Sequence, residues 1–225
     1  IDKKGNLIAI FYSDYYPRDG KGAGAWCGRF RPQSYDGAMR VQPIVTNVCN
    51  MTLPAEEGGP ALQTVDNVLT MFHEFGHALH SFFRDVQYEG TGGVERDFVE
   101  LPSQINEHWA FEPEVLRQYA RHYRTGEVIP QELVEKIDAS SKYGQGFATV
   151  EYLAASYVDL DLHYLTEMPK KLDVMKFQAE KMRKRGMPSQ ILPRYSVTNF
   201  SHTMGGGYSA GYYSYIWAEV LDADA

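Results

Sequence analysis

The chain has 225 residues, of which 44% are hydrophobic and 23% are charged, and its formal net charge is -7 at pH 7. This composition is typical of a globular protein that is large enough to bury a core. The acidic balance argues against nucleic acid or an anionic membrane as the main partner. No apolar run approaches the roughly 18 residues that a membrane-spanning helix needs. The two cysteines, Cys27 and Cys49, are too few for a disulfide scaffold.

Residues 1–50 have the pattern of strands separated by turns. Leu7–Tyr12, Ala25–Phe30 and Met39–Cys49 contain the β-branched and aromatic residues that favour strands. Leu53–Pro60, which is rich in proline and glycine, ends this part of the chain. We therefore predict a small β-sheet near the N-terminus.

Residues 61–225 have a mainly helical pattern, which is clearest in Leu62–Phe83, where apolar residues recur at intervals of three and four. Pro102 suits the first turn of a later helix, because a proline there loses no hydrogen bond. The other predicted helices are Asp97–Tyr119, Gln131–Ser140, Gly146–Leu165, Val174–Gly186 and Ala210–Leu221. The predicted fold class is mainly α with a small β-sheet near the N-terminus.

A metal-binding motif lies inside the first predicted helix, where residues 73–77 read HEFGH and match H-E-x-x-H. His73 and His77 are four residues apart, so their imidazoles lie one turn apart on one helix face and can hold a zinc ion. Glu74 lies about 60° round the helix from His77. Its carboxylate can therefore overhang the metal and take a proton from a water molecule. A chance match is the alternative, but such a match need not fall within a strongly amphipathic helix.

A catalytic zinc also needs a third protein ligand and one open position. Glu100 follows His77 by 23 residues, which is enough for a loop and a returning helix. Asp97 and Glu107 share its helical face, at spacings of three and seven. A solvated acidic helix face is the alternative interpretation, and the apolar residues around these carboxylates weaken it. The composition alone leaves the third ligand open among Asp97, Glu100 and Glu107.

Three segments resemble one known family. FHEFGHALH, RDFVELPSQINEHW and the glycine- and tyrosine-rich FSHTMGGGYSAGYYSYIW occur here in that order. Together they resemble the thimet oligopeptidase and peptidyl-dipeptidase family of zinc metallopeptidases, and the resemblance extends over nearly the whole chain. NVCNMTLP and INEHW are most similar to the bacterial dipeptidyl carboxypeptidase branch.

This resemblance implies one zinc ion per chain, held by His73, His77 and Glu100, with Glu74 as the catalytic base. It thereby selects Glu100 from the alternatives that composition leaves open. The loop from His77 to Asp97 is slightly shorter than the family pattern, which could alter the rim of the site but should leave the ligands usable.

The resemblance also implies that the late segment contacts substrate and transition state. Without it, the glycines would be interpreted as a flexible loop and the tyrosines as half-buried packing. The residues implied as catalytic are His202, Tyr212 and Tyr215, and those implied as substrate-binding are Tyr208, Gly205 and Gly206.

The remaining histidines have no such support. His80 follows His73 by seven residues on the zinc face, yet a catalytic site keeps one position open, so we expect His80 to pack beside a ligand. His108, His122 and His163 lack ligand spacing and are interpreted as ordinary surface or core residues.

For the architecture, the resemblance implies the zincin-like catalytic half of a larger, helical, two-lobed channel peptidase. Residues 1–225 would form its zinc metallopeptidase catalytic domain, and both chain ends have the character of a fragment of a longer protein. The implied activity is removal of C-terminal dipeptides from short peptides. The alternatives are an endo-acting oligopeptidase of the same family and a non-catalytic peptide-binding protein.

Short peptides are the expected partners, and we expect a monomer that binds neither nucleic acid nor membrane. The sequence favours the cytoplasm as the compartment, with the periplasm as the alternative.

Overall fold

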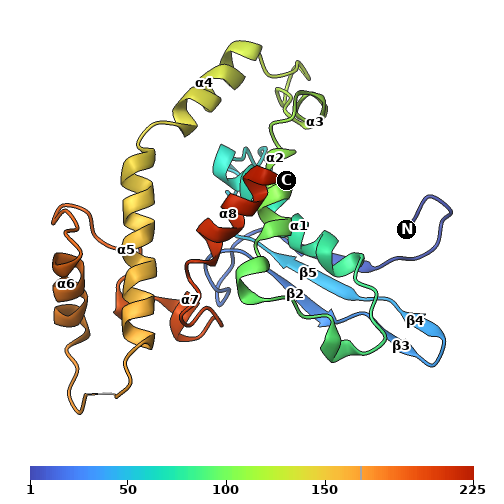
Figure 1. Cartoon of the computed structure of the whole chain (residues 1–225). Coiled ribbons are helices and arrows are strands. Elements are labelled where there is room, and N and C mark those ends of the chain that lie inside the picture. Colours follow the sequence, from blue (N-terminus) through green and yellow to red (C-terminus); the bar gives the residue numbers. More distant parts are fainter. Residues whose placement is uncertain (168) are drawn as a thin grey trace. The chain divides into compact units, whose positions relative to one another are not determined.

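The computed structural model describes residues 1–167 and 169–225 (Figure 1). The described strands lie within residues 10–48 and the described helices follow from residue 65 onward, so the chain is mainly helical with a small N-terminal sheet, as predicted. The chain divides into two compact units, which are Ile1–Ile129 with Ala218–Ala225, and Pro130–Trp217.

The first unit contains a three-stranded sheet in the order β1-β5-β2, and β3 and β4 pair separately as a hairpin. β5 is central, pairing in parallel with β1 and antiparallel with β2. β5 also carries the fully buried Val45. The strands are β1 (Ile10–Asp14), β2 (Trp26–Arg31), β3 (Ser34–Asp36), β4 (Met39–Val41) and β5 (Ile44–Val48).

The single strand predicted at Met39–Cys49 is wrong, because the segment divides into β4 and β5 around Pro43. A proline has no N–H to continue a ladder, and the Pro43 carbonyl instead accepts a hydrogen bond of 2.9 Å from the Ile10 amide, where β1 begins. The strand predicted at Leu7–Tyr12 begins three residues too early. The prediction at Ala25–Phe30 is confirmed to within one residue at each end.

Helix α1 (Val65–Phe82) carries the HEFGH motif and packs on β5 and β2. It begins after Thr64, whose hydroxyl accepts a hydrogen bond of 3.1 Å from the Asn67 amide and so satisfies one free N–H of the first turn. The Phe11 ring of β1 lies 5.6 Å from the rings of both Phe75 and Phe82, with edge-to-face geometry. These contacts fix the helix on the sheet (Figure 1).

Helix α2 (Leu101–His108) packs closely against α1, and Gly76 makes the approach possible. A Cβ at Gly76 would lie 2.5 Å from the Pro102 carbonyl oxygen and 2.7 Å from the Cα of Ser103. Asn106 adds a hydrogen bond of 2.6 Å to the Phe72 carbonyl. Gly76, which lies between the two histidines of the HEFGH motif, is therefore also the point at which α2 packs against α1.

The continuous helix predicted at Asp97–Tyr119 is wrong, because the segment forms three shorter helices. Pro113 begins the last of them, and a proline ring disfavours helical backbone in the preceding residue. Pro102 does lie in the first turn of α2, as predicted. The three helices are η2 (Arg96–Phe98), α2 (Leu101–His108) and α3 (Pro113–Tyr119), and η1 (Glu89–Thr91) precedes them.

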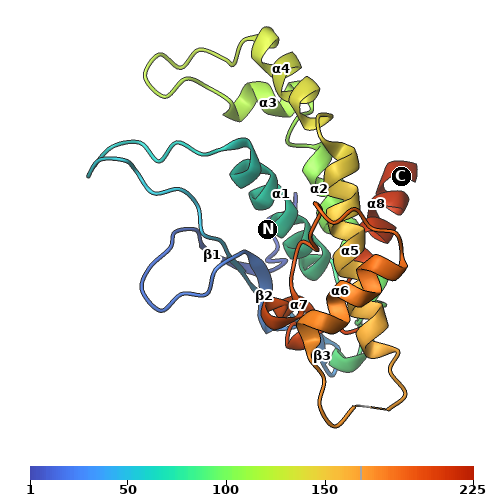
Figure 2. The same ribbon diagram turned by 90° about the vertical axis from the view of Figure 1, so that its left-hand side faces the viewer.

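The second unit is helical, and α6 lies beside α5 (Figure 2). Its apolar cluster joins α5 to α6 and η3. Ala154 and Val158 on α5 are fully buried there, against Met182 of α6 and Val197 of η3. The predicted ends of α4, α5 and α6 are confirmed to within two residues. The elements are α4 (Gln131–Ser141), α5 (Gln145–His163), α6 (Val174–Lys184), η3 (Val197–Asn199) and α7 (Ser201–Met204).

The last helix, α8 (Ser214–Asp224), begins four residues later than the predicted Ala210–Leu221. Ala210 has a φ of 55°, in the left-handed region, and so cannot belong to a right-handed helix. Residues 210–213 form turns instead. Among the described residues, no helix combines the length and the hydrophobicity needed to cross a membrane.

Candidate functional site

The structure brings His73, His77 and Glu100 together as a group that could hold a metal ion, with one ligand atom of each residue within 4.8 Å of the others. We call these three residues the metal group. Oε2 of Glu100 lies 3.2 Å from Nε2 of both histidines. Tetrahedral zinc with bonds of about 2.0–2.1 Å has ligand atoms about 3.3–3.4 Å apart. The three side chains therefore fit a zinc ion in both chemistry and spacing.

Glu100 is held firmly, since it is only 2% exposed and lies where the chain enters α2. The Ser103 hydroxyl lies 2.7 Å from the Glu100 carbonyl oxygen and 3.0 Å from its Oε2. Ser103 is completely buried as well. Asp97 lies in η2 and is not part of the metal group.

Glu107 contacts the other nitrogen of His73, with its Oε1 2.6 Å from Nδ1. A carboxylate on that nitrogen fixes the imidazole tautomer and orientation and makes the free nitrogen a better ligand. Burial lowers the pKa of His73, but Glu100 and Glu107 outweigh it and raise the pKa to about 10. The two carboxylates thus favour a positive charge here, which a proton or a divalent cation can supply.

Glu74 lies on α1 between the two histidines and is 5% exposed. Its Oε2 is buried and, among the described residues, has no hydrogen-bond partner. Burial raises the pKa of this carboxyl group, because the charged form loses solvation. A carboxylate oxygen in this state is suited to accept a proton from a water molecule bound beside it.

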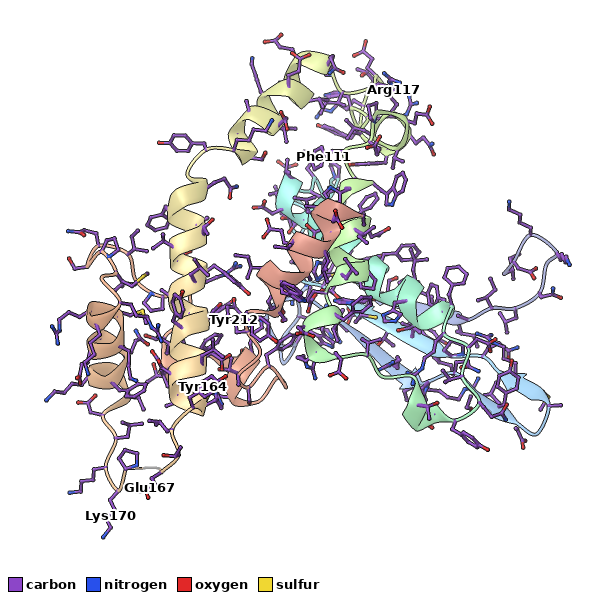
Figure 3. The ribbon with its side chains drawn as sticks, viewed as in Figure 1. Phe111, Arg117, Tyr164, Glu167, Lys170 and Tyr212 are labelled. Carbon is purple, nitrogen blue, oxygen red and sulfur yellow. The ribbon has the colours of Figure 1, made fainter. Side chains whose placement is uncertain are left out.

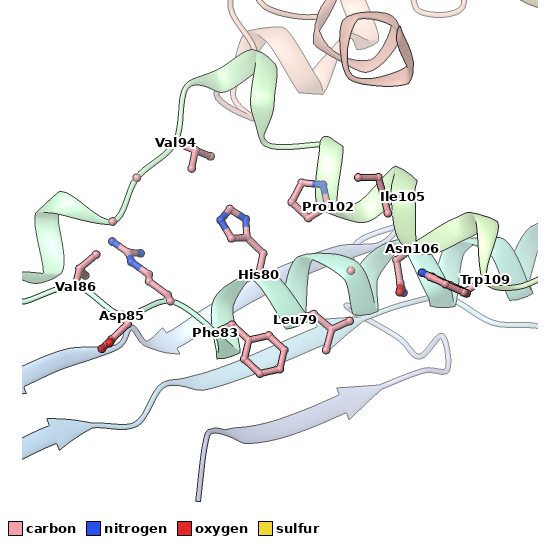
Figure 4. A pocket seen from close by; sticks show the side chains of 14 residues that line it. Leu79, His80, Phe83, Asp85, Val86, Val94, Pro102, Ile105, Asn106 and Trp109 are labelled. Carbon is pink, nitrogen blue, oxygen red and sulfur yellow. The ribbon is translucent and has the colours of Figure 1, made fainter. Parts of the chain in front are cut away.

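His80 lies outside the metal group, in keeping with the sequence interpretation. It lines a pocket of about 650 Å³ in the first unit, and Figure 4 shows its ring among side chains from α1, α2 and the loop between them. The other lining residues include Leu79, Phe83, Ile105 and Trp109. Burial lowers the pKa of His80, which favours the neutral ring.

In the second unit, the predicted late residues gather around the His202 ring. Its centroid lies 5.4 Å from that of Tyr212, 6.2 Å from Tyr208 and 6.3 Å from Tyr215. The rings of Tyr208 and Tyr215 stack at 5.4 Å. We call residues 205–215 the tyrosine segment.

Tyr212, labelled in Figure 3, belongs to the core of the second unit and is only 2% exposed. It stacks on Tyr152 at 5.0 Å and meets the Phe200 ring edge-on at 4.7 Å. Burial raises its pKa far above the ordinary value of a phenol. Tyr208 and Tyr215 are less buried than Tyr212.

The glycines that begin the tyrosine segment have a steric function. A Cβ at Gly206 would lie 2.9 Å from the His202 carbonyl oxygen, so the chain could not return over α7 with a side chain there. Gly207 has a φ of 83°, which favours glycine. Gly205 has room for a Cβ and shows neither constraint.

Several contacts of these sites were not predicted from the sequence. Ser103 follows Glu100 by three residues, a spacing that could have suggested the hydrogen bond. Glu107 was predicted only as a possible ligand, and Gly76 only as the variable position of a motif. The backbone of the tyrosine segment is bound by Asp159, which no motif marks.

Comparison with known proteins finds relatives that match the chain along its whole length. A family model described as Peptidase family M3 matches residues 1–225. Dipeptidyl carboxypeptidase of Escherichia coli (strain K12) is 43% identical over 227 residues, which cover 100% of this chain and 33% of that protein. Oligopeptidase A of the same organism is 39% identical over 232 residues, covering 100% of this chain and 33% of that protein.

Saccharolysin of Saccharomyces cerevisiae is more distant, at 31% identity over 228 residues, which cover 99% of this chain and 32% of that protein. The chain thus spans about a third of the length of these curated relatives. Since the family model covers the whole chain, the chain belongs to peptidase family M3.

Proposed function

We propose that residues 1–225 form the catalytic domain of a zinc metallopeptidase that hydrolyses short peptides. The observation that carries the proposal is the spacing of 3.2 Å between Glu100 and each histidine of the HEFGH helix, which suits one zinc ion per chain. Membership of peptidase family M3 supports the same activity. In this proposal the chain is the zincin-like half of a larger, two-lobed, helical channel peptidase.

Zinc, when bound, lowers the pKa of a water ligand towards about 7 and polarises the peptide carbonyl. His73, His77 and Glu100 hold the ion, and Glu107 orients His73 through Nδ1. Glu74 takes the proton from the attacking water and carries it to the leaving amine. The buried Oε2 of Glu74 supports this role, since no described residue competes for it.

The late residues are proposed to act on the bound peptide. His202 and Tyr215 donate hydrogen bonds to the oxyanion, while Tyr208 and the backbone of Gly205 and Gly206 bind substrate. Such donors are most effective when the transition state carries more charge than the substrate carbonyl. The burial of Tyr212 favours a supporting role for that ring, although the family resemblance also implies it as catalytic.

For specificity, we propose the removal of C-terminal dipeptides, because the 43% identity to a dipeptidyl carboxypeptidase exceeds the 39% identity to an oligopeptidase A. Endo-acting cleavage is the second candidate, since these two identities differ little. A peptidyl-dipeptidase must bind the free C-terminal carboxylate of its substrate, whereas an endopeptidase need not.

The test uses the complete, zinc-loaded protein and one defined peptide, prepared with a free and with an amidated C-terminus. Product masses should show successive loss of C-terminal dipeptides from the free form and little cleavage of the amidated form. Equal internal cleavage of both forms would establish the endopeptidase. Zinc binding without turnover of either peptide would leave only the non-catalytic peptide-binding alternative.

A further inference from the structure

Asp159 of α5 is a completely buried carboxylate in the second unit, remote in sequence from the metal group. Its Oδ1 accepts a hydrogen bond of 3.0 Å from the Ala210 amide, and its Oδ2 accepts one of 3.0 Å from the Tyr212 amide. Nδ1 of His163, one helical turn further along α5, lies 2.9 Å from Oδ1. Burying a charged carboxylate is costly unless it is paired, and here both of its oxygens have partners.

The backbone that Asp159 binds is strained. Ala210 has a φ of 55°, and it is the only non-glycine residue with a positive φ in the part of the chain that the structure describes. A conformation of this kind persists only where the surroundings impose it. Asp159 can impose this conformation, because its carboxylate accepts a hydrogen bond from the amide of Ala210 itself and another from the amide of Tyr212. Hydrogen bonds to a charged acceptor are stronger than neutral ones.

Two other hydrogen bonds of the tyrosine segment are local. The Tyr208 amide bonds to the His202 carbonyl at 3.0 Å, and the Ser209 hydroxyl bonds to the Thr203 carbonyl at 2.6 Å. Both acceptors belong to α7, which has only four residues and lies next to the segment in sequence. Asp159 instead ties the segment to α5, a helix of 19 residues with a packed apolar face.

A second contact from α5 reaches the same point of the segment. The Tyr152 hydroxyl donates a hydrogen bond to the Tyr212 carbonyl, and the Tyr152 ring stacks on the Tyr212 ring. Tyr152 and Asp159 are seven residues apart, which places them on one face of the helix, two turns apart. The backbone of Tyr212 is therefore held through both its N–H and its C=O group.

We propose that Asp159 is a positioning residue for the reaction, acting as an anchor that fixes residues 210–212 and thereby sets the orientation of Tyr215. This inference rests on the proposed role of the tyrosine segment in catalysis. The anchor divides the segment into two parts. Residues 205–209, with their glycines, lie before it and can move, whereas Tyr212 is fixed by it.

The test compares Asp159→Asn with Asp161→Asn in the complete, zinc-loaded protein. The asparagine keeps the size of the side chain but turns an NH2 group towards one of the two amides. Asp161 is the matched control, because it lies on the same helix and pairs instead with Arg185 at 2.7 Å. We expect Asp159→Asn to lower kcat by about 10²-fold through misplacement of the donors, with KM and zinc content changed little, and Asp161→Asn to retain activity.

Two further measurements separate positioning from general destabilisation. In a Tyr215→Phe background, Asp159→Asn should cost much less than it does alone, because the group that it positions is already lost. Amide hydrogen exchange of residues 210–213 should be faster in Asp159→Asn and unchanged in Asp161→Asn. The exchange experiment does not depend on turnover.

If exchange accelerates but the parent protein cleaves no peptide, the anchor holds and the proposed function fails. If Asp159→Asn matches the parent in both exchange and kcat, the anchor is wrong. Should Asp159→Asn fail to fold, His163→Gln is measured instead, since it removes one partner of the carboxylate and leaves both amides bonded. A smaller change in the same direction would then support the anchor, and unchanged exchange and kcat would overturn it.

Discussion

His73 and His77 lie on one face of an 18-residue helix, whereas Tyr208 and Tyr212 lie in the irregular segment between α7 and α8. The metal group takes its spacing from regular helix geometry and from the close packing of α1 and α2 at Gly76. The tyrosine segment takes its geometry from glycines, a strained Ala210 and a buried carboxylate on another helix.

This difference predicts that the metal group is the more rigid of the two regions. Ligands on packed helices keep their positions whether or not substrate is present, as a metal centre requires. The glycines at the start of the tyrosine segment can let the proposed substrate-binding Tyr208 move onto the substrate after binding. We therefore expect substitutions in the first region to alter metal binding, and substitutions in the second to alter turnover with the metal retained.

The largest effect is expected for Glu100→Ala, which removes a proposed ligand. Loss of a residue that only hydrogen-bonds to a metal ligand lowers metal affinity by at most about 10²-fold. Loss of a ligand itself should lower zinc affinity by more than this, and peptidase activity should fall with it. Metal analysis after dialysis against a weak chelator measures the effect, with Asp97→Ala as the control that retains zinc. Normal zinc in Glu100→Ala together with loss in Asp97→Ala would show that the third ligand is wrongly assigned.

Glu74→Gln should separate metal binding from chemistry. The amide preserves the shape of the side chain but cannot accept the proton, so kcat should fall by about 10²–10⁴-fold while zinc content stays at the parent value. Glu57→Gln, an exposed glutamate in the loop before α1, is the matched control. Near-normal kcat with full zinc in Glu74→Gln would exclude Glu74 as the base.

The tyrosines test the second region directly. Tyr215→Phe should lower kcat by about 10²–10³-fold with little change in KM, because an oxyanion donor acts mainly in the transition state. Tyr212→Phe should lose less than about tenfold, roughly 1.4 kcal/mol, because the ring is retained in the core. The reverse order of the two effects would make Tyr212 the donor and Tyr215 the packing residue.

The sequence predicts more of the metal group than of the tyrosine segment, because local helix geometry determines more of the first region. Helical periodicity and the HEFGH spacing predict α1 and the pairing of His73 with His77, because both depend on residues close in the chain. The choice among Asp97, Glu100 and Glu107 depends on how α2 approaches α1, and that is a tertiary contact. The family resemblance, rather than the spacing, favoured Glu100, and the structure places the same residue in the metal group.

The anchor of the tyrosine segment was not predictable from local pattern. Asp159 and Asp161 are two residues apart in the run YVDLDLH, and nothing in the run distinguishes them. In the fold, Asp159 is completely buried and accepts hydrogen bonds from two backbone amides, while Asp161 pairs with Arg185. Likewise, the helix predicted from Ala210 begins only at Ser214, because the tertiary contact overrides the local helical preference.

The smallest effect is expected for Glu107→Gln, which tests whether support of a ligand can be separated from ligation. The amide keeps the shape of the glutamate but not its charge, so the imidazole of His73 becomes less basic and less firmly oriented. Zinc affinity should fall by about 10–100-fold, less than in Glu100→Ala. Competition with a chromophoric chelator measures the affinity, and Glu112→Gln, an exposed glutamate before α3, is the control.

With excess zinc, the kcat of Glu107→Gln should return to near the parent value, because the three proposed ligands and Glu74 remain in place. A loss as large as that of Glu100→Ala, without recovery at high zinc, would make Glu107 a ligand, and unaltered affinity would show that its contact with Nδ1 does not support the metal.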